Sequence, residues 1–330
     1  MRAKLINVLK MKTLVRVIAR LGGSMDNSIE RICVVGAGFM GSQIALYCAS
    51  HGHDVWVYDH SPDALQKADL TFREILAHRS EQELLEEEPA EILARLHIID
   101  SLHLAVSDAD LVIESVPEKL VLKQRVFADL DALVPEHCIL ATNSSAICVS
   151  QLEPSVKLKE RIVNMHFYPP IWQRPMVEIM GTDNTKPECI KQLRDFCCQL
   201  NLTPLMVSKE SMGFIFNRVW HAIKRECLQL VDEGVCSFQD VDRAWMIATR
   251  SPIGPFGMMD MVGLDVVQDI ELLYFEKSAD PADAPCALLK EKIKRGELGI
   301  KVGRGFYQYP QPEFQRVDWL TGGDSSPKKP

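Results

Sequence analysis

The side chains best suited to proton transfer are His166 and Glu178, which stand twelve residues apart on either side of the proline-rich stretch 169–175. A histidine takes up a proton near neutral pH, and a carboxylate on its second ring nitrogen fixes the tautomer and stabilises the imidazolium. Such a pair can remove a hydroxyl proton while hydride leaves the carbon, as the oxidation of an alcohol requires. His166 ends a predicted strand, 161–166, and Glu178 lies in the next, 176–180, so a chain reversal between them brings the two together.

A glycine-rich turn within residues 31–41 offers a place for the hydride acceptor. The segment has the pattern of a strand, a tight turn and the start of a helix. We expect Gly36 to allow the sharp turn, Gly38 to let backbone N–H groups approach a pyrophosphate, and Gly41 to let the helix pack closely on the strand. The N-terminus of that helix then stabilises the phosphates. The predicted cofactor contacts at this turn are Gly36, Gly38, Phe39, Met40 and Gly41.

Asp59 indicates which dinucleotide binds. It ends the alternating segment 54–59, which has the pattern of a second strand, and its carboxylate can accept hydrogen bonds from the adenosine ribose hydroxyls. A 2′-phosphate would meet like charge there, and the next residues are His60 and Ser61 rather than an arginine. The sequence therefore predicts NAD rather than NADP. It predicts no metal, because no His/Cys cluster has the spacing of a zinc site.

The remaining patterns predict the fold class α/β: an N-terminal Rossmann-type dinucleotide-binding domain with an all-α C-terminal domain. Strand and helix patterns alternate from residue 29 to about 207, which is typical of a parallel sheet covered by helices. Between the second and third predicted strands, 62–96 has the pattern of two helices broken near the acidic run 81–91. We place the NAD-binding domain at 25–207.

From residue 208 onward only helical patterns follow, including a long one at 214–233, another at 258–275 and a third at 285–295. We therefore predict a helical substrate and dimerisation domain at 208–310. The tail 311–330 is rich in Pro, Gly, Ser and Lys, which is typical of a flexible terminus.

The first 24 residues carry six Lys/Arg and no acid. They have the pattern of either a mitochondrial transit peptide or a non-native extension, such as an upstream start or a vector leader. Serine occurs there once, whereas transit peptides are Ser-rich, so the non-native extension is favoured. The predicted compartment is the cytoplasm, with the mitochondrial matrix as the alternative if residues 1–24 are a transit peptide.

Composition excludes several classes of protein. The net charge of −8 argues against general binding to nucleic acid or to anionic membranes, and no apolar run is long enough for a membrane span. The ten cysteines are scattered, without a C-x-x-C motif, and this pattern is typical of reduced intracellular thiols.

The segment that holds the histidine resembles the 3-hydroxyacyl-CoA dehydrogenase family, whose motif is His-Phe-Phe-Asn-Pro followed by a glutamate twelve residues after the histidine. Here the motif is His-Phe-Tyr-Pro-Pro, with Glu178 at that spacing. The same ungapped alignment places residues 143–145 on the family's Asn-Thr-Ser loop and 212–218 on its Gly-Phe-Ile-x-Asn-Arg segment. Residues 254–265 and 299–307 are similar to signatures of the family's helical domain.

The resemblance, which covers about residues 29–309, implies NAD-dependent, reversible oxidation of a 3-hydroxyacyl-CoA to the 3-ketoacyl-CoA. It implies that His166 is the general base, that Glu178 orients and polarises it, and that the substrate oxygen is held by two further side chains. These are Ser145 and Asn217. The further cofactor contacts that it implies are Glu118, Lys123 and Asn143. From the residues alone, Ser145 could instead cap a turn, and Glu118 and Lys123 could belong to a solvated helix face.

Two departures from the family leave the substrate open. Pro169 replaces the motif's asparagine, and the helical pair within 62–96, where the family meets CoA, is acidic. Its obvious phosphate partners are Lys67, Arg73, Arg79 and Arg95. The alternative is a dehydrogenase of a free 3-hydroxy acid, such as L-gulonate or carnitine, with Arg174 as the candidate basic group at the pocket mouth. A remote alternative is a non-catalytic, crystallin-like NAD-binding protein.

The helical domain also implies a homodimer, since family members pair through it. Phe214, Phe216, Val219 and Trp220 need burial somewhere, either within the subunit or against a second copy. An acyl-CoA substrate would place the protein in fatty acid metabolism.

Overall fold

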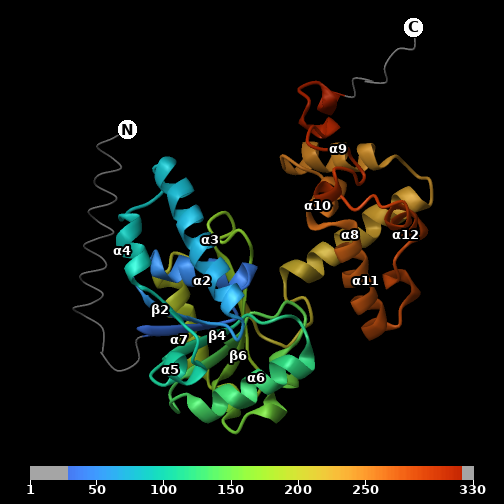
Figure 1. Cartoon of the computed structure of the whole chain (residues 1–330). Coiled ribbons are helices and arrows are strands. Elements are labelled where there is room, and N and C mark those ends of the chain that lie inside the picture. Colours follow the sequence, from blue (N-terminus) through green and yellow to red (C-terminus); the bar gives the residue numbers. More distant parts are fainter. Residues whose placement is uncertain (1–28, 322–330) are drawn as a thin grey trace. The chain divides into compact units, whose positions relative to one another are not determined.

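A computed structural model describes residues 29–321 (Figure 1). The chain forms two compact units, and the boundary between them in the sequence falls between Phe214 and Ile215. The sequence placed this boundary after residue 207, before the segment that leads into the first long helix. The predicted leader, residues 1–24, and residues 322–330 of the predicted tail lie outside the described residues.

The first unit is built on one eight-stranded sheet with the order β3-β2-β1-β4-β5-β6-β7-β8. Neighbouring strands are parallel except β6 and β7, which are antiparallel. This is the Rossmann-type architecture that the alternating patterns predicted. The strands are β1 (Arg31–Val35), β2 (Asp54–Tyr58), β3 (Leu96–Ile99), β4 (Leu111–Glu114), β5 (Ile139–Thr142), β6 (Ile162–Phe167), β7 (Met176–Met180) and β8 (Thr203–Val207).

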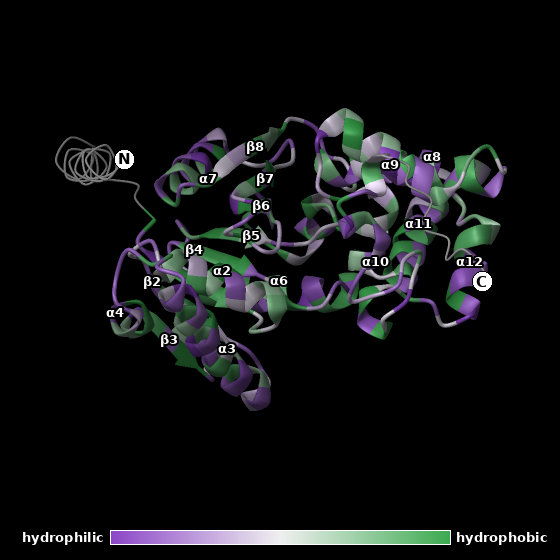
Figure 2. Ribbon diagram, turned by 90° about the horizontal axis from the view of Figure 1, so that it is seen from above, coloured by the Kyte–Doolittle hydropathy of each residue, from purple (hydrophilic) through white to green (hydrophobic). Residues whose placement is uncertain are grey.

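Helices cover both faces of the sheet, and alternation along β1 explains why. Ile32 and Val34 point into one core, which they share with the helices α2, α3, α4 and α7, while Cys33 and Val35 point into a second core with α5 and α6. Figure 2 shows the hydrophobic strands between these layers. The helices are α2 (Phe39–Ala49), α3 (Pro62–Glu81), α4 (Pro89–Ala94), α5 (Leu102–Val106), α6 (Leu120–Leu133) and α7 (Pro187–Gln199), with 3-10 turns η1 (Val149–Gln151), η2 (Glu153–Ser155) and η3 (Lys159–Arg161).

The second unit is helical in its described part and has a core of its own. Gly263, with φ +98°, divides the single helix that the sequence predicted over 258–275 into α10 and α11. Its elements are α8 (Phe216–Asp232), α9 (Phe238–Thr249), α10 (Pro255–Val262), α11 (Leu264–Ser278), α12 (Ala287–Lys294), η4 (Pro281–Asp283), η5 (Ile300–Val302), η6 (Glu313–Gln315) and η7 (Trp319–Thr321).

The prediction of a flexible tail from residue 311 is wrong for the described part of it. Phe314 and Trp319 are buried, and both belong to the helical unit's hydrophobic core, where Trp319 contacts the Tyr307 ring edge-on. The composition of the segment indicates flexibility, but these two large aromatic side chains bury apolar area and so pack the segment against the helical core.

Within the described residues no helix combines the length and the apolar character needed to cross a membrane. The ten cysteines all lie in this part of the chain and carry free thiols.

Candidate active site

His166 and Glu178 face each other across β6 and β7. They are directly paired in the antiparallel register, which places both side chains on the same face of the sheet. Nδ1 of His166 lies 3.1 Å from Oε2 of Glu178, and both side chains are buried. The chain reversal between the strands therefore brings the two together as the sequence predicted. The carboxylate sits where it can fix the imidazole tautomer with the proton on Nδ1.

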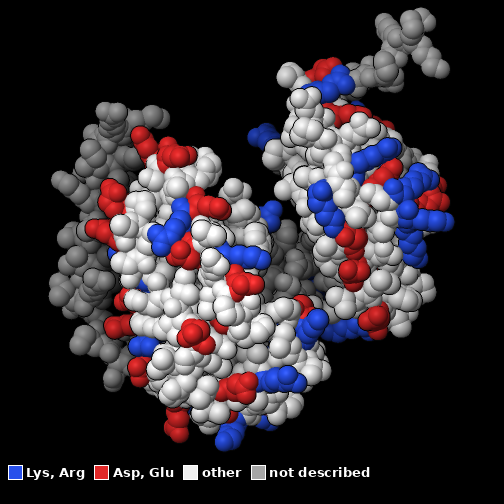
Figure 3. Space-filling view, in the orientation of Figure 1, with Lys and Arg blue, Asp and Glu red and all other residues white. Residues whose placement is uncertain are grey.

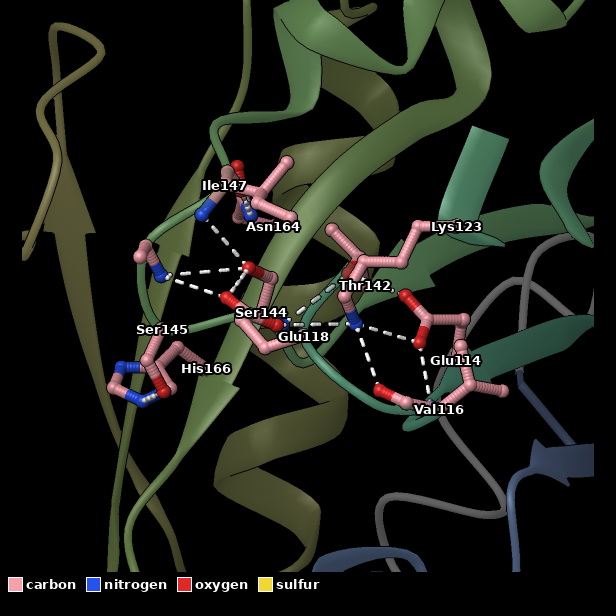
Figure 4. A network of polar contacts seen from close by, with 11 residues as sticks. Glu114, Val116, Glu118, Lys123, Thr142, Ser144, Ser145, Ile147, Asn164 and His166 are labelled. Atoms are coloured by element: carbon pink, nitrogen blue, oxygen red, sulfur yellow. Dashed lines mark hydrogen bonds and ion pairs between the residues drawn. The ribbon is translucent and has the colours of Figure 1, made fainter. Parts of the chain in front are cut away.

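The second ring nitrogen of His166 meets Ser145. This serine lies in the loop after β5, and its Oγ is 3.0 Å from Nε2 (Figure 4). With Nδ1 directed at Glu178, Nε2 is the nitrogen that can accept a proton, and Oγ marks a place where a substrate hydroxyl can be held beside it. The geometry supports a site in which a base lies between a hydroxyl and an orienting carboxylate.

The imidazole ring is also held by packing. Phe214 stacks on it with ring centroids 5.0 Å apart and an interplanar angle of 25°. Phe214 itself adopts φ +53°, a conformation that is unusual for a bulky residue. Asn143, a predicted cofactor contact, accepts a hydrogen bond on Oδ1 from the backbone N–H of Phe167 over 2.9 Å, which ties the loop after β5 to β6.

Glu118 lies between β4 and α6 and contacts the loop after β5, which holds Ser145 (Figure 4). It accepts hydrogen bonds from the Ser144 hydroxyl and from the Ala146 N–H, and its Oε2 lies 3.3 Å from Nζ of Lys123. Burial alone would raise the pKa of Glu118, but the Lys123 ammonium and the Ser144 hydroxyl bring it below its usual value. Glu118 thus remains ionised and fixes the residue next to Ser145.

Lys123 is 1% exposed, so the alternative of a solvated helix face is wrong for it. Its Nζ donates to Oε1 of Glu114 over 2.7 Å and to the Val116 carbonyl over 3.1 Å. Glu114 ends β4, is fully buried, and also accepts from the Thr142 hydroxyl over 2.6 Å. A buried ion pair persists only with such additional hydrogen bonds.

Sequence reasoning missed Glu114. The available signal was an acid at the end of an apolar strand with a lysine nine residues later, which becomes a pair only once strand and helix are folded together.

The glycine turn fits a dinucleotide at each of its three positions. A Cβ on Gly36, which has φ +105°, would lie 2.7 Å from the Ser115 carbonyl, and one on Gly41 would lie 1.8 Å from the Gly36 oxygen. A Cβ on Gly38 would meet nothing within 4 Å, so open space lies in front of this residue. Gly38 is also the N-cap of α2 and has no side chain to bind the first N–H groups. These donors are therefore directed at the place where a pyrophosphate would sit.

Asp59 follows β2 and lies against this turn. Its Oδ2 accepts from the Ala37 N–H and its Oδ1 from the Ser61 N–H, both over 2.9 Å. The carboxylate is thus held beside the turn, where it could accept from a ribose hydroxyl. Phe39, at the first residue of α2, is 72% exposed, and Met40 is half-buried.

Asn217 is the second residue of α8 and belongs to the second unit, where it is half-buried. Its part in binding the substrate oxygen stays a prediction. No group of three or more potential metal ligands comes together within residues 29–321.

Comparisons with known proteins identify relatives of both units of the chain. The chain matches the family model of the 3-hydroxyacyl-CoA dehydrogenase NAD-binding domain over residues 31–211 and that of the family's C-terminal domain over 213–309. A Bacillus subtilis relative, named probable 3-hydroxybutyryl-CoA dehydrogenase, is 32% identical over 86% of this chain and 98% of its own. A Mesorhizobium japonicum relative, 5-formyl-3-hydroxy-2-methylpyridine 4-carboxylate 5-dehydrogenase, is 32% identical over 85% and 91%.

Among solved structures, (S)-3-hydroxybutyryl-CoA dehydrogenase from Ralstonia eutropha is similar with a TM-score of 0.80 and 32% identity. The match covers 86% of this chain and all of that one.

Proposed function

The chain belongs to the 3-hydroxyacyl-CoA dehydrogenase family, and on that premise we propose that it oxidises a 3-hydroxyacyl-CoA to the 3-ketoacyl-CoA. It is an NAD-dependent oxidoreductase. The observation that carries the proposal is that the two ring nitrogens of His166 have different partners, Ser145 Oγ at 3.0 Å from Nε2 and Glu178 Oε2 at 3.1 Å from Nδ1.

The residues divide the chemistry among them. Nε2 of His166 takes the proton of the 3-hydroxyl group, while Glu178 stabilises the imidazolium that forms. Ser145 holds the substrate oxygen next to Nε2, so that oxygen, base and carboxylate are aligned before reaction. NAD, when bound, supplies the acceptor for the hydride that leaves C3. In the reverse direction the imidazolium returns the proton to the oxygen of a 3-keto compound.

The thioester is supported by the relatives that carry the name 3-hydroxybutyryl-CoA dehydrogenase over nearly their full length. Oxidation of such thioesters would place the protein in fatty acid metabolism. We propose a cytoplasmic location, with the mitochondrial matrix as the alternative.

A free 3-hydroxy acid is the second candidate, and it is favoured because three of the four predicted phosphate partners, Arg73 and Arg79 on α3 and Arg95 just after α4, already contact other groups. Arg73 forms two hydrogen bonds with Asp69, Arg95 binds Glu87 over 2.5 Å, and the Arg79 guanidinium lies over the Trp172 ring. Figure 3 shows acidic side chains where α3 ends. A CoA phosphate would have to displace these partners or meet their charge.

Arg174 is the basic group that a free carboxylate could use. It is exposed, lies in the loop between β6 and β7, and donates to the Pro169 carbonyl over 2.8 Å. That contact engages part of its guanidinium, which has five N–H donors in all.

The test compares acetoacetyl-CoA with free acetoacetate by NADH absorbance, using wild type, Arg174→Gln and the exposed control Arg194→Gln. Turnover of the thioester, unchanged in both variants, would support the proposal. Turnover only of the free acid, with KM raised at least tenfold in Arg174→Gln and unchanged in Arg194→Gln, would overturn it for the second candidate.

We also propose a homodimer. Phe214 is buried in the first unit and Trp220 packs against the helical core, whereas Phe216 and Val219 on α8 are exposed. Further exposed apolar side chains of the helical unit are Ile247, Met261, Val262, Leu272 and Leu273. Such side chains are typical of an interface. Light scattering at micromolar protein should give twice the chain mass of 37.2 kDa, and a monomeric mass would refute pairing.

A further inference from the structure

Tyr168 follows the last residue of β6 and stands where the family motif has a phenylalanine. Because side chains alternate along a strand, Tyr168 shares a face of the sheet with His166 two residues before it. The two ring centroids are 4.4 Å apart, and the tyrosine side chain is buried. Its hydroxyl donates a hydrogen bond to Oε2 of Glu178 over 2.7 Å.

Oε2 of Glu178 is therefore shared by two donors, since it also lies 3.1 Å from Nδ1 of His166. Glu178 is fully buried, so contacts within the protein rather than bulk water determine how its charge is stabilised. A hydrogen bond to an ionised group is strong, and a cation beside the same carboxylate oxygen weakens it by compensating part of the charge. Tyr168 thus stabilises the carboxylate more when His166 is neutral than when it is an imidazolium.

We propose that Tyr168 is a positioning residue of the reaction: its hydroxyl fixes the Glu178 carboxylate and takes up part of its charge, so that His166 is ready as a base at lower pH. The inference rests on the proposed function, since it assigns Tyr168 a part in the same proton transfer.

The groups around the pair come from several elements. Ser145 in the loop after β5 meets His166, Phe214 stacks on the imidazole, and on β8 the residue paired with Glu178 is the apolar Leu205. The two hydrogen bonds described at Oε2 come from titratable groups, the His166 imidazole and the Tyr168 hydroxyl. Replacing tyrosine by phenylalanine removes one donor and preserves the ring.

The experiment measures the pH profile of kcat/KM for oxidation in wild type, Tyr168→Phe and Tyr47→Phe. Tyr47 is the matched control, because its buried hydroxyl donates to the Leu200 carbonyl over 3.1 Å, away from the pair. In Tyr168→Phe the midpoint of the rising limb should move up by about 0.5–1 pH unit. Below that midpoint kcat/KM should fall about 3- to 10-fold. Tyr47→Phe should keep the wild-type profile, and the Tyr168→Phe shift should vanish in a Glu178→Gln background.

A second measurement does not depend on substrate. NMR titration of the His166 imidazole, assigned by the signal missing in His166→Gln, should show the same upward movement in Tyr168→Phe. Midpoints equal to wild type in both measurements would overturn the inference and leave the proposed function intact. An NMR shift in a protein that turns over neither thioester nor free acid would uphold the effect of Tyr168 on the pair and refute the proposed function.

Discussion

Two buried histidines, one in each unit, lie beside carboxylates, and they differ at the second ring nitrogen. His166 has Glu178 on Nδ1 and the Ser145 hydroxyl on Nε2. His221 on α8 has Glu271 at 3.0 Å from Nδ1 and Asp283 at 3.1 Å from Nε2. A substrate hydroxyl can be held beside a nitrogen that faces a hydroxyl, whereas carboxylates on both sides leave His221 no nitrogen to take a substrate proton.

Two cations and a tyrosine ring surround His221 and its two carboxylates, and together these side chains form one cluster. Lys224 lies 2.6 Å from Glu271, Arg225 lies 2.7 Å from Asp283, and the Tyr274 ring stacks on His221 at 3.8 Å. Burial alone would raise the pKa of Glu271, but the His221 hydrogen bond and the Lys224 ammonium bring it below its usual value. The cluster joins α8, α11 and η4, so its buried charges hold helices together. Burial beside a carboxylate is common to both histidines, and the partner of the other ring nitrogen distinguishes the proposed base from the structural one.

The largest expected difference comes from the two glutamates. Glu178→Gln should lower kcat by about 10²–10⁴-fold, because an amide no longer stabilises the imidazolium or fixes its tautomer. Glu271→Gln should keep kcat within about threefold per folded molecule and lower the thermal midpoint instead. Steady-state kinetics with thermal denaturation checks both. Equal losses of activity in Glu271→Gln and Glu178→Gln would contradict the different roles assigned to the two glutamates.

Lys224→Met should lower the free energy of unfolding of the helical unit by about 3–5 kcal/mol, because Glu271 loses the ammonium that compensates its buried charge. Urea denaturation followed by tryptophan fluorescence measures the loss. Lys191→Met is the control: its pair with Asp195 is exposed, and its removal should cost less than about 1 kcal/mol. Equal losses in the two variants would show that burial of the pair has no consequence.

Asp242 is another buried carboxylate of the helical unit, and it should make the stability of that unit depend on pH. Burial raises its pKa to about 6, although it accepts hydrogen bonds from the Phe256 and Gly257 N–H groups and the Tyr307 hydroxyl. Between pH 6 and 4 the folded unit therefore binds the proton more tightly than the unfolded chain. Its free energy of unfolding should rise as pH falls through this window, by about 2–3 kcal/mol. Asp242→Asn should lack this rise, and parallel pH curves for the two proteins would contradict the assignment.

The smallest effect is expected for Ser145→Ala. Its kcat/KM should fall about 10- to 100-fold, since one hydrogen bond to a charged reacting group contributes about 1.5–3 kcal/mol. Ser155→Ala, at the end of η2, is the control and should behave as wild type. A Ser145→Ala enzyme with unchanged kcat/KM would remove the hydroxyl from the proposed mechanism.

What could be predicted from sequence follows from local constraints. Gly36 is required by its positive φ and Gly41 by its close approach to the Gly36 oxygen, both within one strand–turn–helix unit, so their spacing alone indicated the turn. His166 and Glu178 are joined by a single chain reversal, which fixes their register. In both cases the interacting residues belong to two consecutive elements and the turn that joins them.

The features that were missed depend on distant partners. β3 has four half-buried residues at the edge of the sheet, too few for a period to be recognised, and the sequence placed a helix up to its first residue. Glu114 is explained only by Lys123 and Thr142, which come from other elements. Trp319 is buried through contacts of the helical core, which the composition of its own segment does not indicate. The motif of Tyr168 was visible, but its bond to Glu178 required the structure.

The proposed base is His166 and not His221. The direct test measures NADH oxidation with acetoacetyl-CoA and with acetoacetate for wild type, His166→Gln and His221→Gln, each with NADH affinity measured by fluorescence. We expect His166→Gln to lose about 10²–10⁴-fold in kcat with NADH affinity unchanged, while folded His221→Gln stays within about threefold of wild type. A His166→Gln enzyme that keeps its kcat within threefold would contradict this assignment.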